Sequence, residues 1–333
     1  MLFSSQSLTD HLNQLFAEKE ITNYSQTVEL IVDSELRGIH THGLMLLPGI
    51  FSAIDTGKII PENSPIISYN NDSIINIDNN KAFGVNAGNY ACDLLNQNLA
   101  SFVLIQNMNH WGRANYYISK ILNKNKLSIG LVLTSPIMKF LSSSKLAIGN
   151  NVFSCGIPSQ NSEALVVDFC TSILSVGKIQ ENLLLGRKTD SYIGYDNEGR
   201  LTKDPEKVMD QGLVLPFASH KGDIISLLIT LFISLFANRF DYLDLFSKQN
   251  IGKERASVPS DTALLFSIDI DKYPGFKNIS LLLEFLEKKL SNEEEVAFLP
   301  GLHSKKISAH NQANGINISD SLIGFLREKK INF

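Results

Sequence analysis

The chain has 333 residues, of which 44% are hydrophobic and 19% are charged, and its formal net charge is −4. This composition is ordinary for a globular protein, and the weak negative charge argues against a nucleic-acid partner, which would favour a basic surface. Cys92, Cys155 and Cys170 are too few and too scattered for a disulfide framework or a tetrahedral zinc site, so we expect no metal. The first residues lack the pattern of a signal peptide, and we expect a cytoplasmic protein.

The N-terminal part of the chain predicts helices followed by the start of a sheet. Apolar spacing predicts three helices in roughly the first 60 residues, the first capped by Thr9-Asp10 and the third ended by Thr56-Gly57. Residues 73–78 and 102–105 predict strands. Between them, a helix should begin at Phe83-Gly84 and run toward Leu99.

The remainder of the chain predicts more strands and helices around a long loop. Residues 128–133 and 264–270 have the apolar pattern of buried strands. Residues 134–158 are rich in Ser, Gly and Asn and predict a long shaped loop, and a polar surface loop is expected at 248–261. Residues 282–290 predict an amphipathic helix, and Ser319-Asp320 should cap the last helix.

One apolar segment, residues 224–237, must be weighed as a membrane span. It has only 14 residues, whereas a transmembrane helix needs about 20. Ser226, Thr230 and Ser234 recur every four residues and so share one face of a helix. This spacing favours a buried helix packed closely on a neighbour, and we expect no membrane contact.

Two polar segments carry the residues that are suited to proton transfer. The run from Glu35 to Gly43 holds His40, Thr41 and His42 at a predicted break between helices. A second block, residues 107–113, contains His110 and the only tryptophan. The unperturbed pKa of histidine lies near neutrality, so two histidines in separate glycine-containing segments predict general acid-base chemistry.

Eight segments, in order along the chain, resemble motifs of the type-2 malate/L-lactate dehydrogenase family. They are Leu36-Arg37-Gly38 with Thr41-His42-Gly43, residues 107–112, residues 167–172 with 177–179, residues 196–199, residues 201–205, residues 215–216 with 221–222, residues 299–301 and residues 314–316. His-Trp at 110–111 and Leu-Thr-Lys-Asp-Pro at 201–205 lean toward the 2,3-diketo-L-gulonate reductase branch.

The resemblance implies an α/β (α+β) fold that binds a nicotinamide cofactor without a Rossmann motif, and no Gly-x-Gly-x-x-Gly follows a predicted strand here. It also implies a helical domain formed by residues 1–70 with 300–333, and a mixed α/β domain of residues 71–125 with 250–299. Residues 126–249 would form the cofactor domain. The family is dimeric, so a homodimer is implied, with NAD(P)H as cofactor and NADH slightly preferred.

The resemblance also assigns roles to individual residues. His42 would give the proton to a substrate carbonyl, with His110 and Asp168 as its catalytic partners. The cofactor would be bound by Asp168, Phe169, Cys170, Thr171, Ser172, His220, Lys221, Gly301, Leu302 and His303. The substrate would meet Thr41, Leu46 and Arg113.

Each role has a plainer alternative. His42 could be a structural turn residue, and His110 a buried histidine hydrogen-bonded beside Trp111. Asp168 could cap the segment that follows it, and Lys221 could be an exposed surface lysine. Cys170 reads as a small buried residue rather than a nucleophile. Arg37 reads as structural, through Glu35 or a carbonyl, and His40 as a variable neighbour.

Three positions depart from the family pattern. The arginine that clamps the substrate carboxylate in the family is Leu46 here, and leucine cannot form a bidentate ion pair. The Gly-rich cofactor loop reads Ser142-Ser143-Ser144-Lys145, and Leu302-His303 stands where relatives carry an acid. The interpretation is therefore a reductase of a C=O or cyclic C=N bond with an altered substrate site. A catalytically impaired relative that is kept for binding or assembly is the rival.

Overall fold

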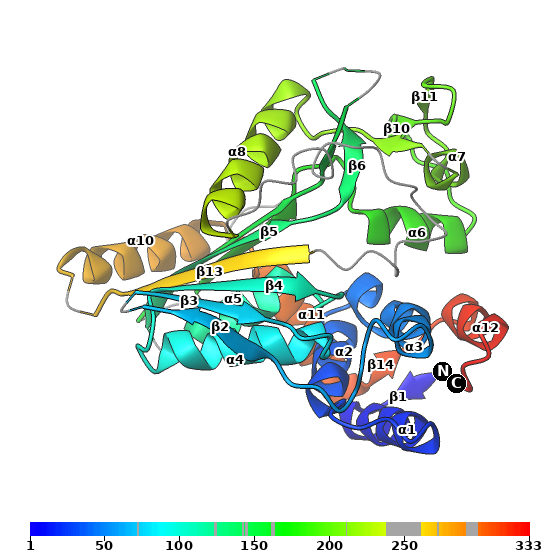
Figure 1. Ribbon diagram of the computed structural model, residues 1–333, viewed down its shortest axis with the longest axis horizontal. Helices are drawn as coiled ribbons and strands as arrows, with labels where there is room; N and C mark the ends of the chain where they lie inside the picture. The colour runs from blue at the N-terminus through cyan, green and yellow to red at the C-terminus, as the bar shows by residue number, and fades with distance from the viewer. Residues whose placement is uncertain are drawn as a thin grey trace.

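A seven-stranded sheet forms the centre of the molecule in this computed structural model (Figure 1). The structure describes residues 1–71, 73–122, 125–141, 143, 146–160, 164–210, 212–237, 261–271, 273–290 and 299–333. The strands, in spatial order, are β2 (Ile66–Asn70), β3 (Ile74–Asp78), β4 (Phe102–Met108), β13 (Asp261–Asp269), β5 (Lys126–Leu133), β8 (Val152–Ile157) and β9 (Leu165–Cys170). β3 and β4 pair in parallel, as expected for strands joined by a crossover helix, and the other neighbours are antiparallel.

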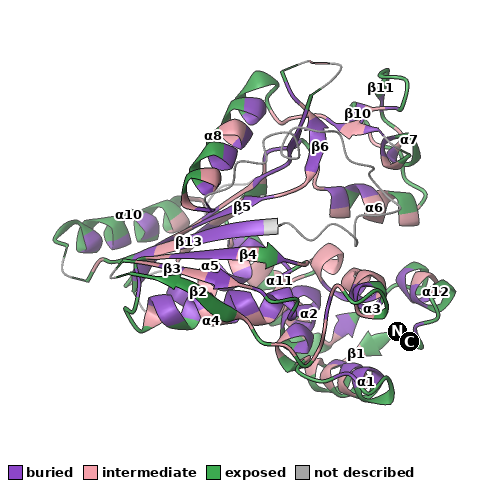
Figure 2. Ribbon diagram, in the orientation of Figure 1, coloured by how far each residue is buried: buried purple, intermediate pink, exposed green. Residues whose placement is uncertain are grey.

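Helices cover both faces of this sheet. α4 (Gly84–Asn96) and α5 (Ala114–Leu122) pack on one face, and α8 (His220–Ala237) packs on the other (Figure 1). The alternation of β4 shows why: Val103 and Ile105 belong to the α4–α5 core, whereas Leu104 belongs to the α8 core. Figure 2 shows the middle strands buried between these layers, and α10 (Gly275–Leu290), which follows β13 in the chain, has an exposed outer face.

The two ends of the chain form one helical body, as predicted. Its elements are β1 (Leu2–Phe3), α1 (Ser5–Glu18), α2 (Ser25–Leu36), η1 (His40–His42), η2 (Leu44–Leu46), α3 (Leu47–Asp55), α11 (Leu302–Asn314), β14 (Ile316–Asn317) and α12 (Asp320–Glu328). β1 pairs with β14, and side chains of α1, α2, α3 and α12 share one apolar core. Ser319 caps α12 as predicted, but the cap of α1 is Ser4, not Thr9-Asp10, because Ser4 accepts from the Ser7 amide and the helix starts earlier.

The segment predicted as a long loop at 134–158 is instead three strands, and that prediction was wrong. Besides β8, it contains β6 (Pro136–Lys139) and β7 (Ala147–Gly149) of a second sheet. That sheet also contains β11 (Leu201–Thr202), β10 (Gly194–Tyr195) and β12 (Leu213–Val214), and α6 (Val176–Leu184) and α7 (Pro205–Met209) belong to the same lobe. Ile137 and Ile148 are buried, so short apolar runs form strands here, and Asn150-Asn151 separates β7 from β8.

The seven-stranded sheet runs across the domain boundaries predicted near residues 70 and 126, since β2 and β5 both belong to it. Those boundaries stay predictions. The polar loop predicted at 248–261 lies outside the described residues, except that Asp261 begins β13. α8 begins at His220, and its 18 residues are long and apolar enough to cross a membrane by length and composition alone. Ser226, Ile229, Thr230 and Ile233 are nevertheless buried, as predicted for a helix packed on the sheet.

Candidate active site

The turn that carries His42 is built around a buried carboxylate. Glu35, in the last turn of α2, is fully buried, and its Oε1 accepts from the Leu44 amide at 2.7 Å. Its Oε2 lies 2.6 Å from His40 Nδ1. A Cβ at Gly43 would overlap this carboxylate, so only glycine allows the turn to close on it. The sequence places Glu35 in the motif but gives no signal of this organising role.

His42 is half-buried in this turn, and its ring lies against that of His110. The two imidazole centroids are 5.7 Å apart, with an interplanar angle of 44°. Thr41 Oγ1 lies 3.0 Å from His42 Nδ1 and so fixes one edge of the ring. Burial lowers the pKa of His42 to about 4, which favours the neutral imidazole at pH 7. Among the described residues, no protein group binds His42 Nε2, so that nitrogen is available for a substrate.

His110 is exposed, contrary to the alternative of a buried histidine beside Trp111. Its Nδ1 accepts from the Gly112 amide at 3.0 Å, which orients the ring just before α5. Trp111 itself is buried and stacks on Tyr117, so the tryptophan of this block is a core residue. The structure therefore separates the two neighbours: Trp111 anchors the block and His110 is presented toward His42.

Asp168 lies near the end of β9 and meets the beginning of α5. Its Oδ2 accepts from the Asn115 amide at 3.0 Å. It therefore caps a helix that precedes it in the chain, not the segment that follows it. Burial raises the pKa of Asp168 to about 6, and the Asn115 amide and the Arg113 charge act in the opposite direction.

Three segments converge around His42. The block 107–113 brings His110 to the site and leads into α5, which holds Asp168. The chain then continues from β9 into α6, and a Cβ at Gly177 in α6 would come within 3.0 Å of Thr41 Cβ. Thr41, His42 and His110 are thus joined by contacts, and Asp168 binds the start of α5, which follows the His110 block in the chain.

Arg113, a predicted substrate residue, is engaged elsewhere. It is buried, its Nε donates to Ser34 Oγ at 3.1 Å, and it forms an ion pair with Asp33. Asp33 also pairs with Arg37, which is structural as expected but through Asp33 and not Glu35. Burial lowers the pKa of Arg113 to about 10, still far above neutrality. These bonds occupy the guanidinium that a substrate carboxylate would need.

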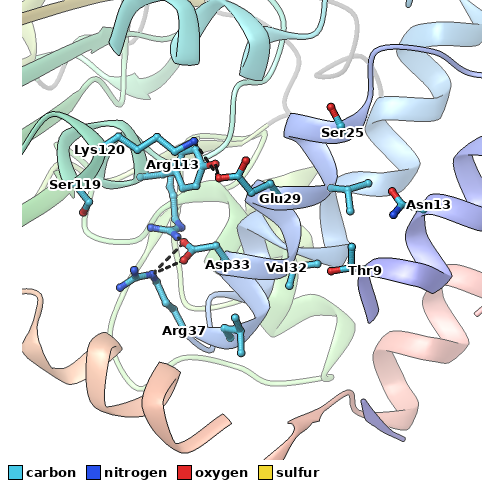
Figure 3. Close-up of a pocket in the computed structure, with 13 residues that line it drawn as sticks. Thr9, Asn13, Ser25, Glu29, Val32, Asp33, Arg37, Arg113, Ser119 and Lys120 are labelled. Carbon is cyan, nitrogen blue, oxygen red and sulfur yellow. Dashed lines mark hydrogen bonds and ion pairs between the residues drawn. The ribbon is translucent and has the colours of Figure 1, made fainter. Parts of the chain in front are cut away.

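Figure 3 shows that Arg113 and Arg37 line a cavity of about 510 Å³ between α1, α2 and α5. The cavity is also lined by Glu29 and Lys120, which form an ion pair at 3.0 Å. None of the predicted catalytic histidines lines it. Its charges are already paired, so it is distinct from the site around His42.

Leu46 belongs to the apolar interior, not to a charged pocket. It ends η2 and packs partly buried against both the helical core and the α4–α5 core. The other cation considered in its place, Lys145, lies outside the described residues. Among the described residues, no cation is therefore seen at the position of the family arginine.

The residues predicted for the cofactor cluster near the end of β9 and the beginning of α8. Thr171 is fully buried, and its Oγ1 has no hydrogen-bond partner among the described residues. Ser172 Oγ donates to the Leu174 carbonyl at 2.7 Å, and Cys170 is partly buried. Phe169 is exposed and meets Phe217 edge to face.

The chain approaches α8 through a strained turn. Ala218 and Ser219 both have positive φ, which non-glycine residues rarely adopt. The Phe217 amide donates to the Thr171 carbonyl at 3.0 Å, which joins this turn to the end of β9. His220 and Lys221 are exposed at the first turn of α8. A helix N-terminus with a lysine and an orphaned buried hydroxyl fits an anionic phosphate group.

Gly301, Leu302 and His303 lie at the start of β9, not at its end. Gly301 has a φ of 92° at the cap of α11, and the Val166 amide donates to the Pro300 carbonyl at 3.3 Å. Leu302 is buried and His303 is exposed. This segment therefore contacts β9 at Val166, which is two residues before Asp168 in the same strand.

Comparisons with known proteins agree with this fold. The family model for malate/L-lactate dehydrogenase matches residues 3–327. The chain is similar to 2,3-diketo-L-gulonate reductase of Klebsiella oxytoca, with 25% identity over 303 residues that cover 88% of this chain and 89% of the relative. It belongs to the malate/L-lactate dehydrogenase family, a family of oxidoreductases.

Solved structures share the fold over nearly the whole chain. A dehydrogenase from Sinorhizobium meliloti has a TM-score of 0.86 at 24% identity and covers 99% of this chain and 98% of its own. Delta1-piperideine-2-carboxylate reductase from Pseudomonas syringae pv. tomato has a TM-score of 0.81 at 22% identity, with 99% of each chain covered. At these identities the structures establish the fold, and the resemblance to the 2,3-diketo-L-gulonate reductase branch is confirmed by the sequence relatives.

Proposed function

We propose that the chain is an NAD(P)H-dependent reductase of a C=O bond in a 2-oxo or diketo compound, with His42 as proton donor. The observation that carries the proposal is the setting of His42: Thr41 contacts Nδ1, the ring lies 5.7 Å from the His110 ring between centroids, and Nε2 has no hydrogen-bond partner among the described residues. A reduced nicotinamide supplies the hydride when it is bound.

His42 and Thr41 would control the transfer of the proton to or from the reacting oxygen of the substrate. In both working states of His42, Nδ1–H donates to Thr41 Oγ1, and Nε2 gives or takes the proton of the reacting oxygen. Because burial keeps the free imidazole neutral, the protein as described is ready to accept a proton from an alcohol. Reduction requires prior protonation of His42, so its rate should rise as the pH falls from neutrality.

The cofactor residues are proposed from the arrangement at β9 and α8. Lys221 and the first turn of α8 would bind a phosphate group, and the Thr171 hydroxyl would gain the partner that it lacks. Phe169, Cys170, Ser172, His220 and the segment Gly301–His303 complete the proposed set. A slight preference for NADH over NADPH is proposed from the resemblance to the diketogulonate reductase branch alone.

The substrate is proposed to carry less negative charge beside Leu46 than a simple 2-oxo acid does. A carboxylate that is buried without a cation pays a large desolvation cost, and Leu46 and the occupied Arg113 supply no partner. A cyclic imine is the second candidate, because the Pseudomonas syringae neighbour is named for reduction of such a compound. A catalytically impaired relative is the third, favoured by Leu46 and by the altered sequence of the Gly-rich loop.

We infer a homodimer from the outer face of α8. Ile224, Leu228, Leu231 and Leu235 recur at helical spacing and are exposed, Leu235 by 77%. After Asp223 the helix has no charged residue, so a second copy of this face is its best-matched partner. Leu228→Glu with Leu235→Glu should halve the mass in sedimentation, and an unchanged mass would overturn this inference. With its three free cysteines, the protein is proposed to be cytoplasmic.

The proposed function is tested by substrate panels. NADH or NADPH consumption would be followed with diketo acids, simple 2-oxo acids and cyclic imines at saturating cofactor. A diketo compound should be the best acceptor. Preferred reduction of a cyclic imine would select the second candidate, and no reduction of any class, despite cofactor binding, would select the impaired relative.

A further inference from the structure

His40 and Glu35 form a pair within the segment that carries the proton donor. Glu35 is 0% exposed, and its two oxygens bind on either side of His42: one meets His40 Nδ1 at 2.6 Å and the other meets the Leu44 amide at 2.7 Å. The carboxylate therefore fixes the chain two residues before and two residues after His42. A single side chain thus spans the whole η1 turn.

The turn has little else to hold it. The backbone bonds in this turn are those from His42 N to the Ile39 carbonyl at 3.0 Å and from Gly43 N to the His40 carbonyl at 3.1 Å. Such a short 3₁₀ turn has poor hydrogen-bond geometry and depends on its side chains. Its position relative to α2 is therefore set by the Glu35 carboxylate together with the Ile39 amide, which donates to the Ser34 carbonyl at 2.9 Å.

A buried carboxylate needs a positive partner, and His40 is the cation within its reach. A charge removed from water is costly unless it is paired and hydrogen-bonded. The hydrogen bond to Glu35 is the largest cause that raises the pKa of His40, and burial opposes it. From α6, Glu181 raises this pKa further and Lys178 lowers it. His40 is 34% exposed at its side chain, so solvent protons reach it.

We propose that His40 is a positioning residue, which acts through Glu35 to hold the η1 turn and thereby to aim His42 Nε2 at the substrate. The proposal rests on the proposed function of His42. It adds to the site His40, which the sequence alone indicates to be a variable neighbour of His42. A displacement of about 1 Å at a reacting group can cost as much as about 10²-fold in rate. The geometry therefore couples a solvent-accessible imidazole to the precision of proton transfer.

The pair also predicts a pH dependence with a definite sign. Since the pKa of His40 is raised, the charged pair is complete at low pH and is lost as the pH rises through that pKa. Above that pKa, the buried Glu35 side chain loses its cationic partner, and the turn loosens. Turnover should therefore fall on the alkaline side through loss of the pair.

The test compares two replacements of His40 with a matched histidine elsewhere. His40→Ala removes the donor and the charge, whereas His40→Asn keeps an amide donor near the position of Nδ1 but cannot titrate. His310→Ala, an exposed histidine on α11, is the control. For each variant, kcat, KM, cofactor affinity, thermal stability and the pH profile of kcat would be measured.

We expect His40→Ala to lower kcat by roughly 10-fold to 100-fold with cofactor affinity unchanged. His40→Asn should recover most of the turnover at neutral pH and lose only the part of the alkaline fall that comes from the His40–Glu35 pair, while the fall that comes from deprotonation of His42 stays. His310→Ala should match the wild type. A wild-type kcat and pH profile in His40→Ala would overturn the proposal. An equal loss in both His40 variants, in step with thermal stability, would also overturn it, because that pattern marks a purely structural role.

Nuclear magnetic resonance of the histidines separates this proposal from the proposed function. The ring signals of His42 should shift in His40→Ala and stay in place in His310→Ala, and Glu35→Gln should lower the pKa of His40. If these shifts occur but the wild type reduces no substrate, the proposed function is wrong, and the proposal that His40 positions His42 is supported. If the wild type is active and the His42 signals do not move, the positioning alone fails.

Discussion

The η1 and η2 turns follow each other in the chain, yet they are held by opposite kinds of contact. η1 is polar: Glu35, His40 and Thr41 hydrogen-bond around His42. η2 is apolar: Leu44 is fully buried, and Leu46 packs against two cores. The resemblance to the family implies that the first turn supplies the proton donor and that the second carries an arginine that binds the substrate carboxylate.

Under the proposed function, the difference means that proton transfer and substrate binding have diverged independently in this chain. A polar turn needs every hydrogen bond satisfied, so one replacement disturbs the whole set. An apolar turn accepts leucine because burial of the apolar side chain stabilises the fold. We therefore infer that the chemistry is retained while the substrate class has changed, and the predictions below test each half.

The largest effect is expected at the polar turn. His42→Ala should lower turnover by on the order of 10²–10⁴, the usual contribution of a positioned general acid. Cofactor affinity should hardly change, because the loss falls on the reacting oxygen. Steady-state kinetics with the best substrate would measure it. Near-normal turnover in the variant would transfer the proton-donor role, first to His110.

The next effect concerns the closure of the turn on Glu35. Gly43→Ala should destabilise the protein by about 1–3 kcal/mol, because the new Cβ overlaps a carboxylate that is enclosed by the core. Gly324→Ala is the matched control, since no atom lies within 4 Å of its Cβ position in α12. Denaturant unfolding would compare the two. Equal stability of both variants would show that the turn is not constrained by Glu35.

A gain is expected at the apolar turn. Leu46→Arg should improve the kcat/KM for pyruvate or oxaloacetate at least about tenfold, which corresponds to ~1.4 kcal/mol. Leu46→Lys should gain less, because an ammonium group cannot pair in a bidentate way. Kinetics on 2-oxo acids would decide. Efficient reduction of these acids by the wild type would mean that another residue clamps the carboxylate.

The smallest effect is the titration of Asp168. Its pKa is raised to about 6, so the folded state keeps a proton that the unfolded state has lost. Its contribution to stability is present at low pH and is lost as the pH rises from about 4 to about 6. The free energy of unfolding of the wild type, relative to Asp168→Asn, should therefore fall over that range. Urea unfolding at several pH values would test this, and a constant difference would contradict the raised pKa.

The fold could be predicted from the sequence because it depends on local patterns, whereas the roles of the site residues stay predictions. Apolar spacing located the helices and several strands, and the motif blocks located His42, His110 and Asp168 in order. The β6–β7 region escaped because its strands are only a few residues long and are separated by turn residues. Single-sequence periodicity cannot resolve strands of that length.

The partners of the site residues could not be predicted, because they come from distant segments. The Asn115 amide meets Asp168, and Ser34 meets Arg113, across 53 and 79 residues of sequence. The Glu35–His40 pair is local, but a run of polar residues does not reveal which carboxylate is buried. Burial is a property of the assembled core, so these contacts required the structure.

The central claim is that this chain uses a nicotinamide dinucleotide, and direct binding tests it. Fluorescence titration of the purified protein with NADH and with NADPH should give saturable binding, with NADH slightly tighter. Lys221→Ala should weaken both, and His42→Ala should bind as well as the wild type. If neither cofactor binds at millimolar concentration, the proposed reductase function is contradicted.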